Sequence, residues 1–152
     1  MNIDAYHENT GDKAFFEGHY YLDQPIGSIF LAVPGYIFLN WIMAVFNIHT
    51  VFLNPENTLL DSLITMINIS LLSAVMAIFF YRLLGYFSTD NRKKILLVLS
   101  YSLGTVAFPY STLFHGHQVS ASLLLISFYL LFSMVRNRKF NNGRLFVSGF
   151  LA

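Results

Sequence analysis

The sequence predicts an all-α integral membrane protein, a polytopic helix bundle whose N-terminal segment is an extracytoplasmic loop. Of its 152 residues, 55% are hydrophobic and only 11% are charged, and the mean hydropathy is +0.55. A soluble domain carries about 25% charged residues, so these few charges could not cover the surface of a soluble fold. The composition therefore excludes a soluble enzyme, a nucleic-acid-binding protein and a disordered chain. The absence of cysteine excludes a disulfide framework and a thiol nucleophile.

The membrane-spanning segments are predicted from the long apolar runs. A span needs about 20 apolar residues, because the hydrocarbon core is roughly 30 Å thick and a helix rises about 1.5 Å per residue. A final run at residues 145–152 is too short to cross, and we interpret it as the start of a truncated helix in one incomplete domain. The predicted order is an extracytoplasmic loop at 1–25, an apolar element at 26–48, and transmembrane helices at 59–81, 95–114 and 119–135.

The basic residues set the predicted orientation. All Lys and Arg residues except Lys13 fall in two clusters, one after the second apolar run and one after the fourth. The positive-inside rule places both clusters in the cytoplasm. The chain is thus predicted to be a multi-pass protein of the cytoplasmic (inner) membrane, with all its histidines at the outer face. The clustered residues are Arg82, Arg92, Lys93, Lys94, Arg136, Arg138, Lys139 and Arg144.

The apolar run at residues 26–48 has two alternative topologies. If it spans the membrane, the acidic segment 1–25 lies in the cytoplasm, which acidic residues oppose only weakly. If it is interrupted at Pro34-Gly35, it forms a re-entrant or juxtamembrane helical element with both ends outside, because proline and glycine weaken a helix. We favour the second topology, since it gathers the polar N-terminal segment and the histidines on one side.

Two polar segments are candidates for chemistry. The first, which contains Asp12 and Asp23, is polar and aromatic and leads into the first apolar run. Asp23 either caps that helix or belongs to a site where the helix start attracts an anion such as a lipid phosphate. The second is the turn with His115 and His117, shortly after Tyr110. These histidines could contact a substrate or lie unliganded at headgroup level, and they lack the third ligand of a catalytic zinc site.

The amino-acid sequences of two segments resemble those of a known family. They are similar to the first extracytoplasmic loop and to the end of a later helix in polytopic glycosyltransferases of the GT-C superfamily, closest to family-39-like relatives of the protein O-mannosyltransferases. The segments are Ile3-Asp-Ala-Tyr-His-Glu-Asn-Thr-Gly-Asp-Lys-Ala with Gly18-His-Tyr-Tyr-Leu-Asp-Gln-Pro-Ile-Gly-Ser-Ile-Phe-Leu-Ala-Val-Pro34, and Ala107-Phe-Pro-Tyr-Ser-Thr-Leu-Phe-His-Gly-His-Gln118.

The resemblance implies a reaction at the outer membrane face. Such enzymes move a sugar from a polyprenyl-phosphate donor to a lipid, glycan or protein acceptor. A carboxylate of the first loop would act as general base on the acceptor hydroxyl. A polar or cationic group would stabilise the phosphate leaving group.

The chain departs from the family pattern at three places. It begins after the family's first helix and principal carboxylate, it has Gln24 where the family has lysine, and it ends at Ala152 before the later helices. We therefore interpret it as an N-terminal fragment that would need the restored chain for activity. The alternatives are a transporter or flippase component for lipid-linked glycans, and a non-catalytic membrane remnant.

The site residues follow from the motifs and the resemblance together. Asp12 and Asp23 are the predicted catalytic residues. No metal ligands are predicted, and dependence on a divalent metal stays open. The expected partners are the lipid-linked donor, its acceptor and membrane lipids, without nucleic acid. The predicted substrate-binding residues are Asp4, Gln24, Tyr110, His115 and His117.

Overall fold

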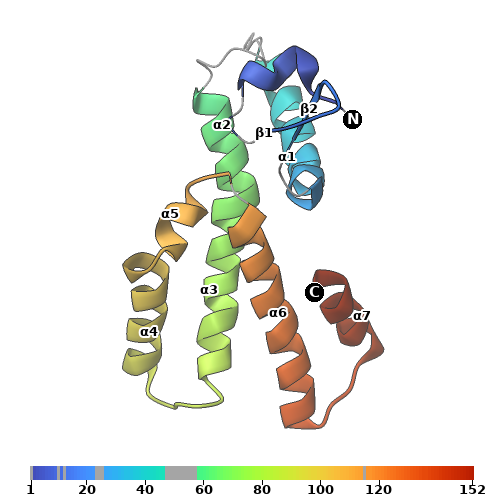
Figure 1. Ribbon diagram of the computed structural model, residues 1–152. Helices are drawn as coiled ribbons and strands as arrows, with labels where there is room; N and C mark the ends of the chain where they lie inside the picture. The colour runs from blue at the N-terminus through green and yellow to red at the C-terminus, as the bar shows by residue number, and fades with distance from the viewer. Residues whose placement is uncertain (1, 10, 12, 23–25, 47–57, 115) are drawn as a thin grey trace. The chain divides into compact units, whose positions relative to one another are not determined.

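The computed structural model describes residues 2–9, 11, 13–22, 26–46, 58–114 and 116–152. The chain is mostly helical and divides into two compact units, Met1–Ile64 and Thr65–Ala152 (Figure 1). Each unit is described by itself below. The helical class predicted from composition is thereby confirmed in its coarse form.

The first unit begins with a short helix and a β-hairpin. The 3-10 helix η1 (Asp4–Asn9) is followed by strands β1 (Lys13–Phe16) and β2 (His19–Leu22), which pair antiparallel. The pairing of Phe16 with His19 leaves a two-residue loop in which Glu17 has a φ of 48° and Gly18 a φ of 84°. Positive φ at both loop residues matches the twist of a hairpin, and glycine adopts it without strain. The structure therefore differs from a purely helical chain at residues 13–22.

The structure has a continuous helix α1 (Ile26–Val45) where the sequence predicted an interrupted element at residues 26–48. It continues through Pro34, so the predicted break at Pro34-Gly35 is wrong. Proline removes one backbone hydrogen bond, and the neighbouring turns can keep the helix intact when theirs remain. Leu39 and Met43 are buried and four residues apart, whereas most other large apolar side chains described on α1 are exposed. Such an outward apolar surface suits contact with lipid.

Two helices among the described residues are long and apolar enough to cross a membrane. The first, Ser62–Leu84, runs through α2 (Thr58–Thr65), the π-helical turn η2 (Met66–Ser70) and α3 (Leu71–Leu84). The second is α6 (Gly116–Asn137). Only 17% and 39% of their apolar windows are buried, whereas the core helix of a soluble protein would be mostly buried. They correspond to the apolar runs predicted at 59–81 and 119–135.

The run predicted as one transmembrane helix at residues 95–114 is not continuous. Helix α4 (Asn91–Gly104) ends before Thr105, which has an extended backbone, and the short helix α5 (Ala107–Ser111) follows. The single-helix prediction is therefore wrong for this run. At the start of α4, the Asp90 carboxylate accepts hydrogen bonds from the backbone N–H groups of Arg92 and Lys93 and so caps the helix.

The core of the second unit lies where α3 packs on α6. Helix α4 also contacts α3, and α7 (Asn142–Leu151) packs on α6 (Figure 1). Ile69, Met76 and Met134 fill the core, each at 2% exposure or less. Small side chains allow α7 to approach α6, because Ser148 is 1% exposed and its carbonyl accepts a 2.7 Å hydrogen bond from the Ser127 hydroxyl. The short run predicted at 145–152 lies in α7.

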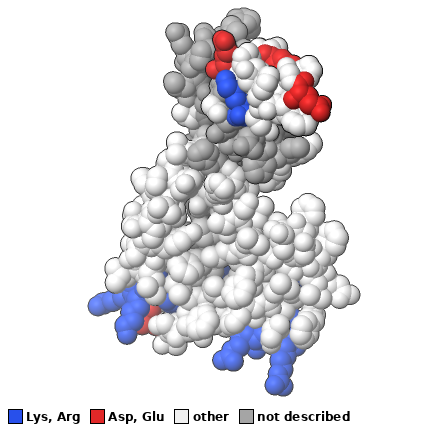
Figure 2. Space-filling view, in the orientation of Figure 1, with Lys and Arg blue, Asp and Glu red and all other residues white. Residues whose placement is uncertain are grey.

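The Lys and Arg side chains of the second unit gather at one end of it. They lie around the turn from α3 to α4 and the turn from α6 to α7, as Figures 1 and 2 show. Aromatic rings lie beside them, with the Lys94 ammonium 4.7 Å from the centre of the Tyr81 ring. The Asn137 amide also donates a 3.0 Å hydrogen bond to the Tyr86 hydroxyl. Cations interleaved with aromatic rings are typical of a membrane–water interface.

Candidate functional site

The break between α4 and α5 lies beside two pockets of the second unit. The Thr105 hydroxyl donates a 2.7 Å hydrogen bond to the Tyr101 carbonyl and accepts a 3.1 Å bond from the Ala107 N–H. One side chain thus satisfies backbone groups on both sides of the break. The chain turns here, and α5 packs against the N-terminal part of α6.

Tyr110 on α5 and His117 on α6 lie together at this place. Their ring centres are 6.3 Å apart and the rings are nearly perpendicular, at 86°. Both side chains are exposed and line a pocket of about 420 Å³, which also has Thr105 and Ala121 in its wall. Two of the predicted substrate-binding residues therefore share one pocket.

A second pocket of about 220 Å³ shares part of its wall with the first. Tyr101, Ala107 and Gln118 line both. The smaller pocket is rich in hydroxyl groups, and several of these already donate to backbone carbonyls. Ser70 donates to Ser111 at 2.8 Å, Ser73 to Ile69 at 2.8 Å, and Ser111 to Phe108 at 2.7 Å. Their lone pairs can still accept hydrogen bonds.

The turn η2 helps to place one of these hydroxyls. Ser70 is its last residue, and its bond to the Ser111 carbonyl ties the start of α3 to the end of α5. A π-helical turn is rare and widens the helix locally, and it is frequently found at functional sites. Here it lies directly beside the smaller pocket.

Gln118 is the exceptional group of the site. It is 5% exposed, and its Nε2 is a buried side-chain nitrogen without a hydrogen-bond partner in the described part of the chain. Its backbone carbonyl accepts a 2.7 Å bond from Ser122, which is fully buried. Leaving a buried amide unpaired costs about 1–3 kcal/mol. An acceptor supplied from outside the chain would remove this cost.

The charge distribution separates the two pockets from the cations. Among the described residues, neither lining includes Asp, Glu, Lys or Arg. The larger pocket lies between the end of α4, α5 and the start of α6, and the smaller one extends along α3. The Lys and Arg side chains lie at the other end of this unit (Figure 2). The site is thus neutral and mainly apolar, with a few polar groups, as is usual for ligand pockets.

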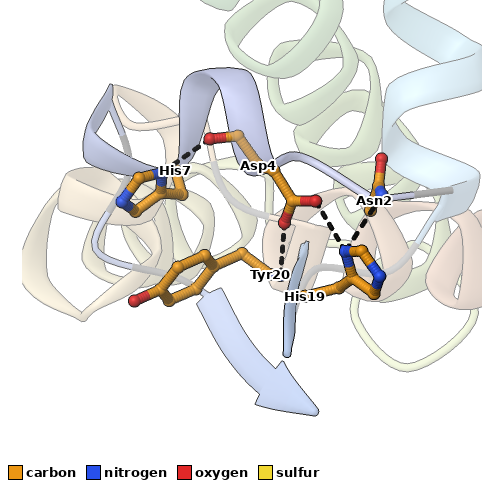
Figure 3. Close-up of polar contacts among 5 residues, drawn as sticks. All are labelled: Asn2, Asp4, His7, His19 and Tyr20. Atoms are coloured by element: carbon orange, nitrogen blue, oxygen red, sulfur yellow. Dashed lines mark hydrogen bonds and ion pairs between the residues drawn. The ribbon is translucent and has the colours of Figure 1, made fainter. Parts of the chain in front are cut away.

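Asp4, which was also predicted to bind substrate, belongs to the first unit and is part of a polar cluster there (Figure 3). One carboxylate oxygen accepts a 2.7 Å bond from the Tyr20 N–H, and the other lies 2.7 Å from Nδ1 of His19, whose ring also approaches Asn2 at 3.4 Å. The His7 ring stacks on Tyr20 at 4.2 Å and bonds to the Asp4 carbonyl at 2.7 Å. The cluster therefore fastens η1 to the hairpin.

These contacts affect the acidity of Asp4. The hydrogen bond from the Tyr20 N–H, followed by that from His19, lowers the pKa of the carboxyl below its ordinary value of 3.8. Both bonds favour the ionised form, and exposure to solvent keeps desolvation small. A general base needs a raised pKa and a free oxygen, so this arrangement suits a structural role.

The structure does not describe the remaining predicted site residues. Asp12, Asp23, Gln24 and His115 are not among the described residues. The two predicted catalytic carboxylates therefore remain predictions. In the described part of the chain, no group of three or more His, Asp or Glu side chains is placed to hold a metal ion.

Gln118 was missed as a site residue because sequence reasoning assigned it to the outer turn. A signal was present, since Gln118, Ser122 and Ile126 follow one another at intervals of four and lie on the buried face of α6. A glutamine on the buried face of an apolar helix is uncommon, and buried polar groups of this kind normally have a hydrogen-bond partner.

Comparisons of the chain with protein-family models, with curated proteins and with solved structures found no match.

Proposed function

We propose that the chain belongs to a multi-pass glycosyltransferase of the GT-C type in the cytoplasmic membrane, with its site on the extracytoplasmic side. The observation that carries the proposal is the separation between the Tyr110–His117 pocket and the Lys and Arg residues of the second unit. Under the positive-inside rule the cationic end faces the cytoplasm. The pocket then opens toward the outer face, where a lipid-linked sugar donor would be used.

The side chains of the pocket suit such a donor. Tyr110 offers an aromatic face to a sugar ring and a hydroxyl to its oxygens. His117 has ring nitrogens that can bond to a phosphate oxygen and is exposed. In this proposal Asp12 or Asp23 takes the proton of the acceptor hydroxyl as it attacks the anomeric carbon, and the polyprenyl phosphate leaves with the bonding electrons.

The orientation can be tested first. The chain has no cysteine, so single cysteines report without background. Leu113 and Phe140 are 50% and 68% exposed and lie just before and just after α6. We expect a membrane-impermeant maleimide to label Leu113→Cys in intact cells and Phe140→Cys only after permeabilisation. The reverse pattern would contradict the proposal.

The activity is tested by transfer of radiolabelled sugar from polyprenyl phosphate in vesicles that contain the restored full-length protein. Asp12→Asn or Asp23→Asn should abolish transfer, and His117→Ala should lower it by about a hundredfold to a thousandfold, the range for loss of one stabilising donor. Ser120→Ala is the matched control, because Ser120 is an exposed α6 residue that lines neither pocket. Unchanged transfer in both Asp variants would refute the catalytic assignment.

The transporter or flippase alternative is favoured by one observation, the two pockets that share a wall between the helices. It predicts movement of lipid-linked glycan across vesicles without covalent transfer. The same vesicles distinguish the two functions, because only a transferase moves the label to the acceptor.

A further inference from the structure

We infer that the smaller pocket of the second unit is a binding site for an uncharged lipid, and that the Gln118 amide donates a hydrogen bond to a carbonyl or hydroxyl oxygen of that lipid. The inference rests on the membrane orientation proposed above, and it does not depend on sugar transfer. It concerns the hydroxyl-lined pocket next to η2, whose lining does not include the exposed His117 ring.

The unpaired amide is the first argument. Gln118 is 95% buried, lines both pockets, and its Nε2 has no acceptor in the described part of the chain. Buried polar side chains in folded proteins nearly always have a partner. No acceptor for this amide lies among the described residues, and the pocket beside it has room for an oxygen supplied by a ligand.

The lining determines the charge of the ligand. Ser70, Ser73, Ser102 and Ser111 supply hydroxyls, and no Lys, Arg, Asp or Glu of the described chain lines the pocket. A phosphate in a pocket without a cation would lose its hydration without compensation. A neutral oxygen loses much less, and a single amide donor is enough to bind it. The remaining wall, which includes Met76, Leu103 and Phe108, is apolar and suits a hydrocarbon chain.

The size and position of the pocket agree with the polar end of a lipid and the first carbons of its chain. Its volume of about 220 Å³ exceeds the roughly 30 Å³ that one water occupies by several fold. Gln118 lies in the first turn of α6, at the end of the second unit opposite the cations, where the proposed orientation places the outer side of the membrane. The ester carbonyls of glycerolipids and the hydroxyls of long-chain alcohols sit at that interfacial depth. Either source supplies the same neutral acceptor.

The amide can be observed directly, because the chain contains only two glutamines, Gln24 and Gln118. The full chain is prepared in detergent micelles with ¹⁵N in the glutamine side chains, and the spectrum of Gln118→Leu assigns the two amide groups. Dioleoylglycerol, oleyl alcohol and octadecene are then titrated separately. We expect a saturable shift of the Gln118 amide with at least one oxygen-bearing lipid, and no shift with octadecene, which has no acceptor.

The three titrations distinguish an ester carbonyl from a lipid alcohol as the acceptor, and they show which results would contradict the inference. A shift with the diacylglycerol alone identifies an ester carbonyl, and a shift with the alcohol alone identifies a lipid alcohol. No shift with either, or an equal shift with octadecene, would overturn the inference, as would an amide that exchanges with water at an unchanged rate under saturating lipid.

A second measurement covers the protein itself. Mass spectrometry of the intact complex should show about tenfold less bound lipid for Gln118→Leu, as expected for one lost hydrogen bond. Ser120→Leu, an exposed change of the same kind on α6, should retain it. Loss of sugar transfer with an intact amide shift would refute only the proposed function, whereas the absence of the shift with active transfer would refute only the lipid site.

Discussion

Asp4 in the first unit and Gln118 in the second are polar side chains with opposite surroundings. Asp4 is at the surface, and both of its oxygens have partners within the chain. Gln118 is buried, and its side-chain nitrogen has none among the described residues. Water could have satisfied Asp4 at little cost, so its contacts organise the local fold. Gln118 lies in the wall of a pocket and has no partner among the described residues, so its environment points to an oxygen that the pocket contents supply.

The serines of α6 and α7 show the third possibility, a polar group that is buried and satisfied. Ser127 is 3% exposed and donates to the Ser148 carbonyl, so it needs nothing from outside. The comparison separates two properties that are often treated as one. Burial decides how much a polar group costs, and the presence of a partner decides whether it serves the fold or a ligand.

The largest expected effect is at the contact of α6 with α7. Ser148→Leu adds bulk at a residue that is 1% exposed, and overpacking of this kind costs about 1–3 kcal/mol. Thermal unfolding of the detergent-solubilised protein should show a clear decrease in Tm. Val147→Leu, on the exposed side of the same helix, is the control and should change the Tm little. Equal Tm values for both variants would mean that α7 is not held against α6.

A smaller loss is expected for the satisfied buried hydroxyl. Ser127→Ala removes the donor to the Ser148 carbonyl, and the free energy of unfolding should fall by about 1 kcal/mol. Denaturant titration in micelles measures it, and Ser120→Ala, at an exposed position on α6, serves as the reference. An unchanged value would remove the distinction between satisfied buried groups and exposed ones.

Gln118→Leu should change the stability in the opposite direction. Without added lipid, the variant removes a buried unpaired amide and keeps most of its volume, so the free energy of unfolding should rise by roughly 1 kcal/mol. The same titration applies, with Ser120→Leu compared at the surface. A destabilised Gln118→Leu protein would show that the amide has a partner in the unliganded state, and the comparison with Asp4 would then fail.

The smallest effect is expected at Asp4 and should stay local. Because the pKa of Asp4 is lowered in the folded state, its contribution to stability is complete above 3.8, its ordinary pKa. It is lost as the pH falls below that value and through the lowered pKa. Hydrogen exchange of the Tyr20 amide should therefore accelerate at acidic pH, relative to exchange at amides outside the hairpin.

The control for this prediction is the neutral variant. Asp4→Asn should speed Tyr20 exchange already at pH 6 and remove the pH dependence that is specific to this amide, while the second unit keeps its Tm. If Asp4→Asn lowered the Tm of the second unit, the assignment of Asp4 to a local structural role would be wrong.

Parts of the fold could be predicted because they depend on local properties. Apolar length is one of them, so the runs at 59–81 and 119–135 correspond to the two helices long enough to span. The helix break at Thr105 depends instead on side-chain bonds to Tyr101 and Ala107, which hydropathy does not report. The hairpin at residues 13–22 had a usable signal in Glu17-Gly18, but the polar composition of the segment favoured a loop.

The candidate site divides in the same way. Tyr110 and His117 were predicted from their motif, and the structure brings their rings to 6.3 Å. Gln118 is the next residue after His117, yet only the packing of α6 reveals that its side chain is buried while that of His117 is exposed. Adjacent residues on a helix point about 100° apart, so one can face solvent while the other faces the core.

The amino-acid sequence by itself determined that this protein is helical and apolar and that its cations fall in two clusters, because composition and spacing along the chain are sufficient for those properties. Only the tertiary structure decided that α3, α4, α5 and α6 line a common pocket, and that Gln118 lies in its wall without a partner among the described residues. The physical reason is that burial and hydrogen-bond satisfaction are relations between residues far apart in the sequence, such as Ser70 and Ser111, and they exist only once the helices are packed.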